Sequence, residues 1–430
     1  MTQASLPARI AAAVVLMLPA AGVIRRGSAM QDNGYVVKAA RALLSGHSPY
    51  ADERFLYLPS SAVAALAEAW LDDRTIQLVF PFVLAVLTLS GWSLALGLCG
   101  VRVGSRLGLL GMAAIALLFG YRSLLAVGNW SVVAVVAFPA ALLLCARNRW
   151  SAAAVVAGVS IALKPMLVPL ALLFLFARRR RALVILVAVP LLLVLLSLPL
   201  TPEPGRFVSD TLPFLLHGQD EYAKPYDASL ASILPRLGAG SDLTLAIRAV
   251  VAVAGLLLAW TRWRLPDDTA VLDRSVLLGE PVGVRNRAGG YVLRSLELRL
   301  VETASMIMVT VFLVFTPGFG HYSLVILLPL AATAIDRRSV ARSPWFWVAL
   351  APQFPGVEIP GLTTPQTRAF TVFFMHGVLA LLLAFRTART SGEPSGSGDP
   401  HDLGEWPEEP IERVVVTAGR RPPDLGAAGG

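Results

Sequence analysis

The densest group of chemically capable side chains lies near the N-terminus, just after an apolar run. Asp32 stands there with Tyr35 three residues later, so that both would lie on one face of a helix. A carboxylate beside a phenol could act as a general base on an acceptor hydroxyl. Alternatively, Asp32 caps a helix that begins at Asn33, a role that aspartate fills well. The spacing alone leaves both interpretations open.

Two isolated cations stand inside otherwise apolar stretches. Lys164 interrupts the run from Ala152 to Phe176, and Arg248 lies a few residues inside a later apolar segment. A charge at membrane depth is costly and commonly meets an anionic partner, so the two side chains together could hold a phosphate. Alternatively, their long side chains extend to the membrane surface.

Two polar turns beside apolar segments add further candidates. Asn129 follows a glycine at the start of one segment, and His321 and Tyr322 follow the sequence Gly318-Phe319-Gly320 at the end of another. A lone histidine in such a turn is more often a hydrogen-bonded structural residue than a catalyst, so this signal also has two interpretations.

Several chemistries are excluded by motif. The chain has no GxxxxGK[ST] phosphate loop, no HExxH and no CxxC, and its five histidines are widely separated. The two cysteines, Cys99 and Cys145, both lie inside apolar runs, which predicts neither a disulfide framework nor a zinc site. We therefore expect no metal and no cofactor.

The composition decides which kind of scaffold must position these residues. Of the 430 residues, 56% are apolar and 15% are charged, against about 25% charged in an ordinary soluble domain. Such a chain has too few charges to cover a soluble globule of this size. The formal net charge of +9 comes from small groups of arginines between apolar runs, a pattern typical of cytoplasmic membrane loops and not of a nucleic-acid-binding surface. Membrane lipids, and no nucleic acid, are the expected partners.

The sequence predicts an all-α polytopic protein of the cell membrane with about twelve transmembrane segments, because a span needs about 20 apolar residues. Arginines gather in alternate connections, which places both termini in the cytoplasm. The predicted segments lie near 7–24, 75–100, 107–120, 129–146, 151–163, 165–177, 182–200, 243–260, 300–316, 322–335, 344–357 and 369–386.

Two predicted outer loops, 25–74 and 201–242, are too long to be simple turns. Apolar and polar residues alternate in them at helical spacing, which predicts amphipathic helices on the outer membrane surface. The cytoplasmic loop 264–299 mixes glycine, arginine and β-branched residues and is expected to form a small ribbon. Residues 1–390 would make one transmembrane domain, and the tail 391–430, rich in Gly, Pro and Ser, is predicted to be disordered.

A series of short motifs follows one another along the chain. They are Asp32-x-x-Tyr35, Gly46-x-x-Pro49-Tyr50, Tyr57-x-Pro59, Gly128-Asn129-Trp130, Leu163-Lys164-Pro165, Asp210-Thr211-Leu212-Pro213, Arg248 and Gly320-His321-Tyr322-Ser323. In order and spacing, these motifs resemble glycosyltransferase family 87, a branch of the C superfamily of lipid-linked glycosyltransferases. The resemblance covers roughly residues 30–390 and is nearest to the branching α-(1→3)-arabinofuranosyltransferases of actinobacterial cell walls.

The resemblance implies a polyprenyl-phosphate-sugar donor and an envelope glycan or glycolipid acceptor, with an active site on the outer face of the membrane. Asp32 would be the catalytic base of an inverting transfer, and Lys164 and Arg248 would bind the donor phosphate. The expected substrate-binding residues are Tyr35, Tyr50, Tyr57, Asn129, His321 and Tyr322.

Three alternatives stay open. The donor sugar could be mannose instead of arabinofuranose. A polytopic transporter or lipid flippase would also carry isolated cations at membrane depth, but with a site at the membrane midplane between repeated halves. A non-catalytic scaffold for envelope assembly would leave Asp32, Lys164 and Arg248 far apart in space.

Overall fold

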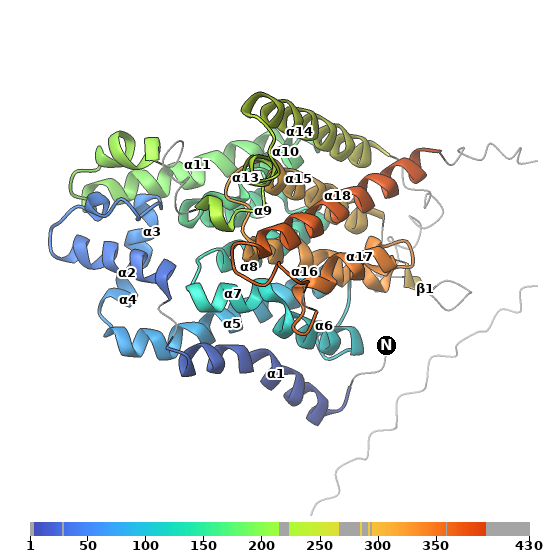
Figure 1. Ribbon diagram of the computed structural model, residues 1–430, viewed down its shortest axis with the longest axis horizontal. Helices are drawn as coiled ribbons and strands as arrows, with labels where there is room; N and C mark the ends of the chain where they lie inside the picture. Colours follow the sequence, from blue (N-terminus) through green and yellow to red (C-terminus); the bar gives the residue numbers. More distant parts are fainter. Residues whose placement is uncertain are drawn as a thin grey trace, which may run out of the picture. The chain divides into compact units, whose positions relative to one another are not determined.

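The computed structural model describes residues 4–27, 30–214, 223–265, 284–285, 291–292, 295–357 and 359–392. These residues lie in one compact unit, 1–392, which is almost entirely helical (Figure 1). The tail after residue 392 and most of the predicted cytoplasmic loop lie outside the described residues.

The helices differ widely in length. The α-helices are α1 (Leu6–Arg25), α2 (Gln31–Leu44), α3 (Pro59–Ala64), α4 (Leu66–Ala69), α5 (Asp73–Leu98), α6 (Arg106–Leu117), α7 (Phe119–Val127), α8 (Val132–Ala146), α9 (Trp150–Leu163), α10 (Leu170–Phe176), α11 (Arg180–Ser197), α13 (Leu230–Arg236), α14 (Ser241–Arg264), α15 (Ser295–Val314), α16 (Leu324–Ala332), α17 (Pro344–Leu350) and α18 (Arg368–Gly392). The short 3₁₀ turns used below are η1 (Pro49–Ala51), η2 (Pro165–Leu167) and η8 (Gly320–Ser323).

The predicted all-helical membrane protein is confirmed, but the predicted number of spans is not shown. Within the described residues, five helices are long and apolar enough to cross a membrane, and a sixth span results if the bent pair α6–α7 is counted as one. Other predicted segments are shorter: α9 has 14 residues, about 21 Å at 1.5 Å per residue, against a hydrocarbon core of about 30 Å. The predicted segment 344–357 contains only the seven-residue α17 and one 3₁₀ turn.

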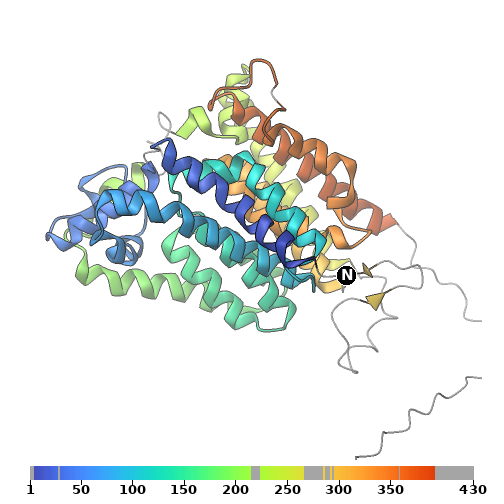
Figure 2. The same ribbon diagram turned by 90° about the horizontal axis from the view of Figure 1, so that it is seen from below.

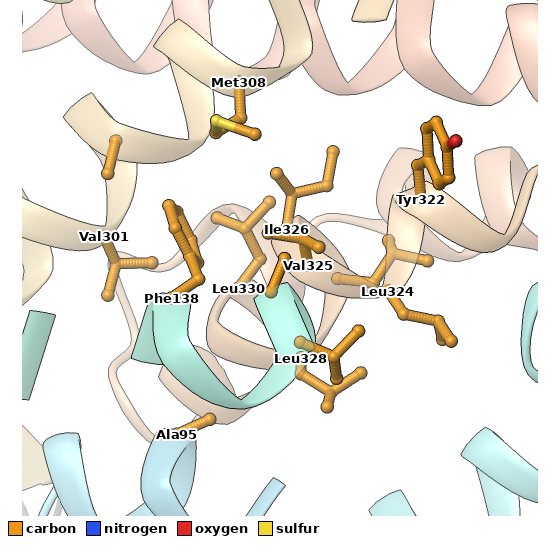
Figure 3. Close-up of a cluster of buried hydrophobic side chains, with 14 of the residues drawn as sticks. Ala95, Phe138, Val301, Met308, Tyr322, Leu324, Val325, Ile326, Leu328 and Leu330 are labelled. Atoms are coloured by element: carbon orange, nitrogen blue, oxygen red, sulfur yellow. The ribbon is translucent and has the colours of Figure 1, made fainter. Parts of the chain in front are cut away.

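The core is built around α16, whose residues are nearly all buried. Figure 3 shows its leucines, Val325 and Ile326 near Phe138 of α8, Ala95 of α5 and Met308 of α15. By contrast, α11 and α14 bury few of their residues: 11% of the most apolar stretch of α11 is buried, and 17% of that of α14. Such faces are suited to contact with lipid, where apolar exposure costs nothing.

The first predicted outer loop forms α2, η1, α3 and α4, which lie together at one end of the helix bundle (Figures 1 and 2). The predicted amphipathic character of this stretch is confirmed in α2, which buries Val36, Val37, Ala39 and Ala40 and exposes Lys38. Two serines fix the next helix: the hydroxyls of Ser60 and Ser61 in α3 donate to the carbonyls of Ala162 and Leu163 at the end of α9.

A buried ionic network joins the C-terminal end of α14 to the N-terminal half of α15. The Arg262 guanidinium donates to Glu302 at 2.6 Å, and Arg386 of α18 lies 3.6 Å from the same carboxylate. Nearby, Asp336 accepts from the backbone and guanidinium of Arg338. The residues between α14 and α15 that the structure describes form the expected ribbon, β1 (Val284–Arg285) antiparallel to β2 (Tyr291–Val292).

Candidate functional site

Asp32 lies in the first turn of α2 and does not cap it. The residue that precedes the helix is Met30, in the left-handed backbone conformation (φ 43°), and Asp32 is the second helical residue. The alternative prediction, a cap on a helix beginning at Asn33, is therefore wrong. A carboxylate in the first turn still gains from the helix dipole, and here its side chain accepts a hydrogen bond from another segment.

That segment is the tight turn between α7 and α8. Gly128 ends α7 with φ 68°, and a Cβ on it would lie 3.0 Å from Cβ of Asn33 and 3.2 Å from Cβ of Met30. Glycine therefore permits both the backbone conformation and the close approach of the turn to α2. The next residue, Asn129, is buried and reaches Asp32 directly.

Asn129 uses both ends of its amide. Its Oδ1 accepts from the backbone N–H of Ser131 at 2.8 Å and from Lys164 Nζ at 2.6 Å, which leaves Nδ2 to donate to Asp32 Oδ2. The Ser131 N–H can only donate, so it fixes which end of the amide faces the carboxylate. Asn129 thus lies between the Asp32 carboxylate and the Lys164 ammonium group, which form no direct ion pair in the part of the chain that the structure describes.

Lys164 is positioned by a break in helix geometry. The helix α9 ends at Leu163, Lys164 is extended (φ −154°, ψ 119°), and Pro165 begins η2. Because the helix ends here, the carbonyls of its last residues have no intrahelical partner, and the serines of α3 donate to those of Ala162 and Leu163. The ammonium group lies 5.2 Å from the ring centre of Tyr57 and 5.0 Å from that of Tyr322, distances typical of cation–π contacts.

The site is partly desolvated. Burial raises the pKa of the Asp32 carboxyl, while the charge of Lys164 and the hydrogen bond from Asn129 lower it. Burial also raises the pKa of Tyr57 well above that of a free phenol, so Tyr57 is neutral beside the two charges. A carboxylate with a raised pKa is a better proton acceptor than an exposed one.

Three other predicted substrate-binding residues, His321, Tyr50 and Tyr35, lie around this cluster. His321 is buried, and its ring centre lies 4.7 Å from that of Tyr322. Tyr50 is buried behind Tyr57, whose backbone carbonyl accepts from its hydroxyl. Tyr35 is partly exposed one turn along α2, and its hydroxyl accepts from Gln31 and Arg54.

Arg248 does not join the cluster by any described contact. It is half-buried in α14, and its Nε donates to the carbonyl of Val314 at 2.8 Å. Val314 is the last residue of α15, whose final carbonyls have no partner within their own helix. Arg248 satisfies one of them. Its predicted role toward a phosphate stays a prediction.

Sequence reasoning missed the residues that hold the cluster in place. Asn33 accepts from the indole N–H of Trp130 and donates to Glu68, so the pairs Asp32-Asn33 and Asn129-Trp130 bond in parallel. Burial raises the pKa of Glu68, and the hydrogen bond from Asn33 lowers it. The two adjacent polar pairs, each placed beside an apolar run, were the available signal.

Asp227 of the second long loop was also missed. Its buried carboxylate accepts four hydrogen bonds, one of them from Gly318 in the turn that precedes His321 and Tyr322. Within the described residues, no group of three or more His, Cys, Asp or Glu side chains is arranged to hold a metal ion.

Comparison with known proteins gives one family. Residues 55–279 match glycosyltransferase family 87, and no curated protein and no solved structure matches the chain. The match contains Tyr57, Asn129, Lys164 and Arg248, whereas Asp32 lies before it and the 321–322 pair after it. Because the match covers more than half of the 430 residues, the chain belongs to glycosyltransferase family 87, and it is a multi-pass membrane protein that transfers a sugar from a donor to an acceptor.

Proposed function

We propose that this member of glycosyltransferase family 87 takes a sugar from a polyprenyl-phosphate donor and transfers it, with inversion, to a hydroxyl of an envelope glycan or glycolipid. The observation that carries the proposal is the Asp32–Asn129–Lys164 arrangement. At one end of the helix bundle, three segments far apart in the chain bring one carboxylate and one ammonium group close together without a direct ion pair.

Asp32 is the base of the proposed reaction. As the acceptor oxygen attacks the anomeric carbon, its proton moves to the Asp32 carboxylate. The bond between the anomeric carbon and the phosphate oxygen breaks, and its electron pair stays on the phosphate. One displacement inverts the anomeric configuration. A single carboxylate suffices, because a phosphate monoester is a good leaving group and needs no strong acid.

Lys164 is the group that meets the leaving phosphate. The phosphate gains negative charge as the bond breaks, so a fixed cation in a partly desolvated site stabilises the transition state more than the ground state. Lys164 has two aromatic rings beside it and one amide oxygen in front of it. It therefore retains donors for a phosphate oxygen.

Asn129 keeps the two charged groups apart. A direct ion pair between Asp32 and Lys164 would use the carboxylate oxygens that must receive the proton and the ammonium group that must bind phosphate. The amide forms one hydrogen bond with each of them and leaves their other hydrogen-bonding positions available. The rings of Tyr57 and Tyr322, with His321 behind Tyr322, would contact the sugar between donor and acceptor.

The surroundings of Lys164 support a lipid-borne donor. Directly after it, Pro165 and Val168 are exposed on an apolar segment, and Leu175 continues this exposed side in α10. An isoprenoid chain can lie along such a surface while its phosphate contacts the ammonium group. We assign the site to the outer face of the membrane on the arginine distribution, and we assign arabinofuranose over mannose on the motif order described above.

A membrane assay tests the proposal. Membranes containing the protein are offered decaprenyl-phosphate arabinofuranose and polyprenyl-phosphate mannose in parallel, with product linkage read by mass spectrometry and NMR. We expect transfer of arabinofuranose, and loss of about 10²- to 10⁴-fold in rate for Asp32→Asn. The matched control is Asp52→Asn, because Asp52 is a carboxylate of the same loop that pairs with Lys38 at 2.7 Å, outside the cluster.

The outcomes separate the levels of the proposal. Transfer of mannose alone would keep the mechanism and overturn the sugar. Full activity of Asp32→Asn would overturn the assigned base. Donor flipping without any glycoside product would favour a lipid flippase.

A further inference from the structure

Asp227 is a carboxylate that the proposed reaction does not use, and each of its oxygens accepts two hydrogen bonds. It is fully buried. Oδ1 accepts from the backbone N–H groups of Ser229 at 2.9 Å and Gly318 at 2.6 Å, and Oδ2 accepts from the hydroxyls of Ser229 at 2.8 Å and Ser232 at 2.7 Å. Three of these bonds are local, but the fourth joins the second long loop to a turn 91 residues later.

The bond to Gly318 is part of a two-sided clamp. While Asp227 accepts from the Gly318 N–H, the N–H of Ala228 donates to the Gly318 carbonyl at 3.2 Å. A Cβ on Gly318 would lie 2.7 Å from the carbonyl oxygen of Phe312 and 3.3 Å from Asp227 Oδ1. The backbone of α15 on one side therefore excludes a Cβ at Gly318, and the loop lies close on the other.

The far side of the same turn is held by other helices. A Cβ on Gly120 of α7 would lie 2.7 Å from the Gly320 carbonyl oxygen, so α7 packs directly on the turn. The Ser323 hydroxyl lies 2.8 Å from Nε2 of His376 in α18. The segment 318–323 is thus fixed at its beginning by Asp227 and at its end by α18.

Between these two anchors stand His321 and Tyr322. The Tyr322 ring is 5.0 Å from Lys164 Nζ and packs edge-on against His321. Only residues 319–321 separate Gly318 from Tyr322. A displacement of Gly318 would therefore move the Tyr322 ring relative to the Lys164 ammonium group. A shift of about 1 Å in a reacting group can cost about 100-fold in rate.

We propose that Asp227 is a positioning residue for the transfer reaction: by holding the 318–323 turn, it sets the place of Tyr322 beside Lys164. This assigns a function to the second long outer loop, which supplies no side chain to the Asp32–Asn129–Lys164 cluster by any described contact. The effect on rate rests on the proposed function, whereas the holding of the turn stands on its own.

A double-mutant cycle tests the effect on rate. We expect Asp227→Ala to lower kcat about 100-fold. Asp227→Asn keeps Oδ1 for Gly318 but loses the charge, so we expect about a 10-fold loss. If Asp227 acts through the turn, Asp227→Ala combined with Tyr322→Ala loses no more than the larger single effect. Multiplying effects would overturn the proposal.

The matched control is Asp336→Asn at the other end of the bundle, where the carboxylate is equally buried. Any effect of Asp336→Asn should multiply with that of Tyr322→Ala, because the contacts of the described residues give the two sites no partner in common.

Hydrogen exchange of the whole protein in detergent supplies a readout that does not depend on the substrate. In Asp227→Asn, and in Asp227→Ala where it folds, we expect faster exchange in segments 227–236 and 316–323, with α5 and α8 unchanged. Unchanged exchange of the turn would overturn the proposal, as would equal loosening of the whole chain. If the wild type transfers neither sugar, the proposed function fails, and exchange alone decides on the turn.

Discussion

Two charged clusters lie at opposite ends of the helix bundle, and they differ in how their charges are paired. In the Arg262–Glu302–Arg386 network, guanidinium groups contact the buried carboxylate directly. In the Asp32–Asn129–Lys164 cluster, an amide separates the two charges. Direct pairing compensates the charges and joins α14, α15 and α18, whereas separation leaves both charges without an ion-pair partner. The first arrangement suits stability, and the second suits chemistry.

The largest expected effect is on the separated cluster. Lys164→Met should lower sugar transfer about 10³-fold, because the leaving phosphate loses its cation. Removal of this partly desolvated charge should leave the thermal unfolding temperature in detergent equal or higher. If Lys164→Met lowered the unfolding temperature as much as loss of the Glu302 carboxylate does, the two clusters would not differ in their contribution to stability.

The paired network should show the opposite behaviour. Glu302→Gln removes the carboxylate that faces the buried Arg262 and the partly buried Arg386, which should cost about 3 kcal/mol of unfolding free energy. The kcat per folded molecule should stay unchanged. Thermal unfolding and an activity assay on the same purified sample measure both quantities. A selective loss of kcat with full stability would show that this end of the bundle takes part in the reaction.

Removing the separator should convert one kind of cluster into the other. Asn129→Ala lets Asp32 and Lys164 approach and form a direct ion pair, which should lower transfer about 100-fold. Asn129→Gln, which keeps the amide on a longer side chain, should lose less. A fully active Asn129→Ala would show that separation of the charges is unimportant.

The pH dependence sharpens the same point. The base must be ionised, and burial raises the pKa of Asp32, so kcat should fall with decreasing pH through a pKa above that of an exposed aspartate. The Lys164 charge lowers this pKa, so the residual activity of Lys164→Met should fall at a higher pH than that of the wild type. An acid limb shifted to lower pH in this variant would contradict the coupling.

An exposed pair gives the smallest expected effect. The Lys38 side chain is 72% exposed in its ion pair with Asp52, and such pairs stabilise by about 0.2–1 kcal/mol. The pair lowers the pKa of Asp52 against the opposing effect of burial, so its contribution is present at neutral pH and is lost as the pH falls through that lowered pKa. A double-mutant cycle of Lys38→Ala and Asp52→Ala by thermal unfolding measures it.

The cluster residues could be predicted where polarity stands out from an apolar background. Asp32 lies in a dense polar group directly after an apolar run, Asn129 and Lys164 are isolated between apolar runs, and in the structure Asn129 contacts both of the others. Arg248 has the same sequence pattern, yet it satisfies an unpaired carbonyl at the end of α15. Hydropathy gives the depth of a charge along a helix but not the neighbour that its side chain meets.

The fold was predictable at the level of apolar helices but not of their lengths. The sequence separates the segments 151–163 and 165–177 at Lys164, as the structure does, but it predicts each of them as a transmembrane segment. In the structure α9 has 14 residues and α10 has 7, because composition does not give the length of a helix. Asp227 could not be found, since nothing in its own surroundings indicates a bond to Gly318, 91 residues away.

The hydrogen bonds from Ser60 and Ser61 to the end of α9 have a consequence for biosynthesis. The two serines precede the carbonyls that they satisfy by about a hundred residues, so a ribosome makes the cap well before the helix end that needs it. When the end of α9 is synthesised, the hydroxyl groups that bond to its last two carbonyls are already present. A chain that received its first loop only later, by circular permutation, would have to form that helix end before its hydrogen-bond donors exist.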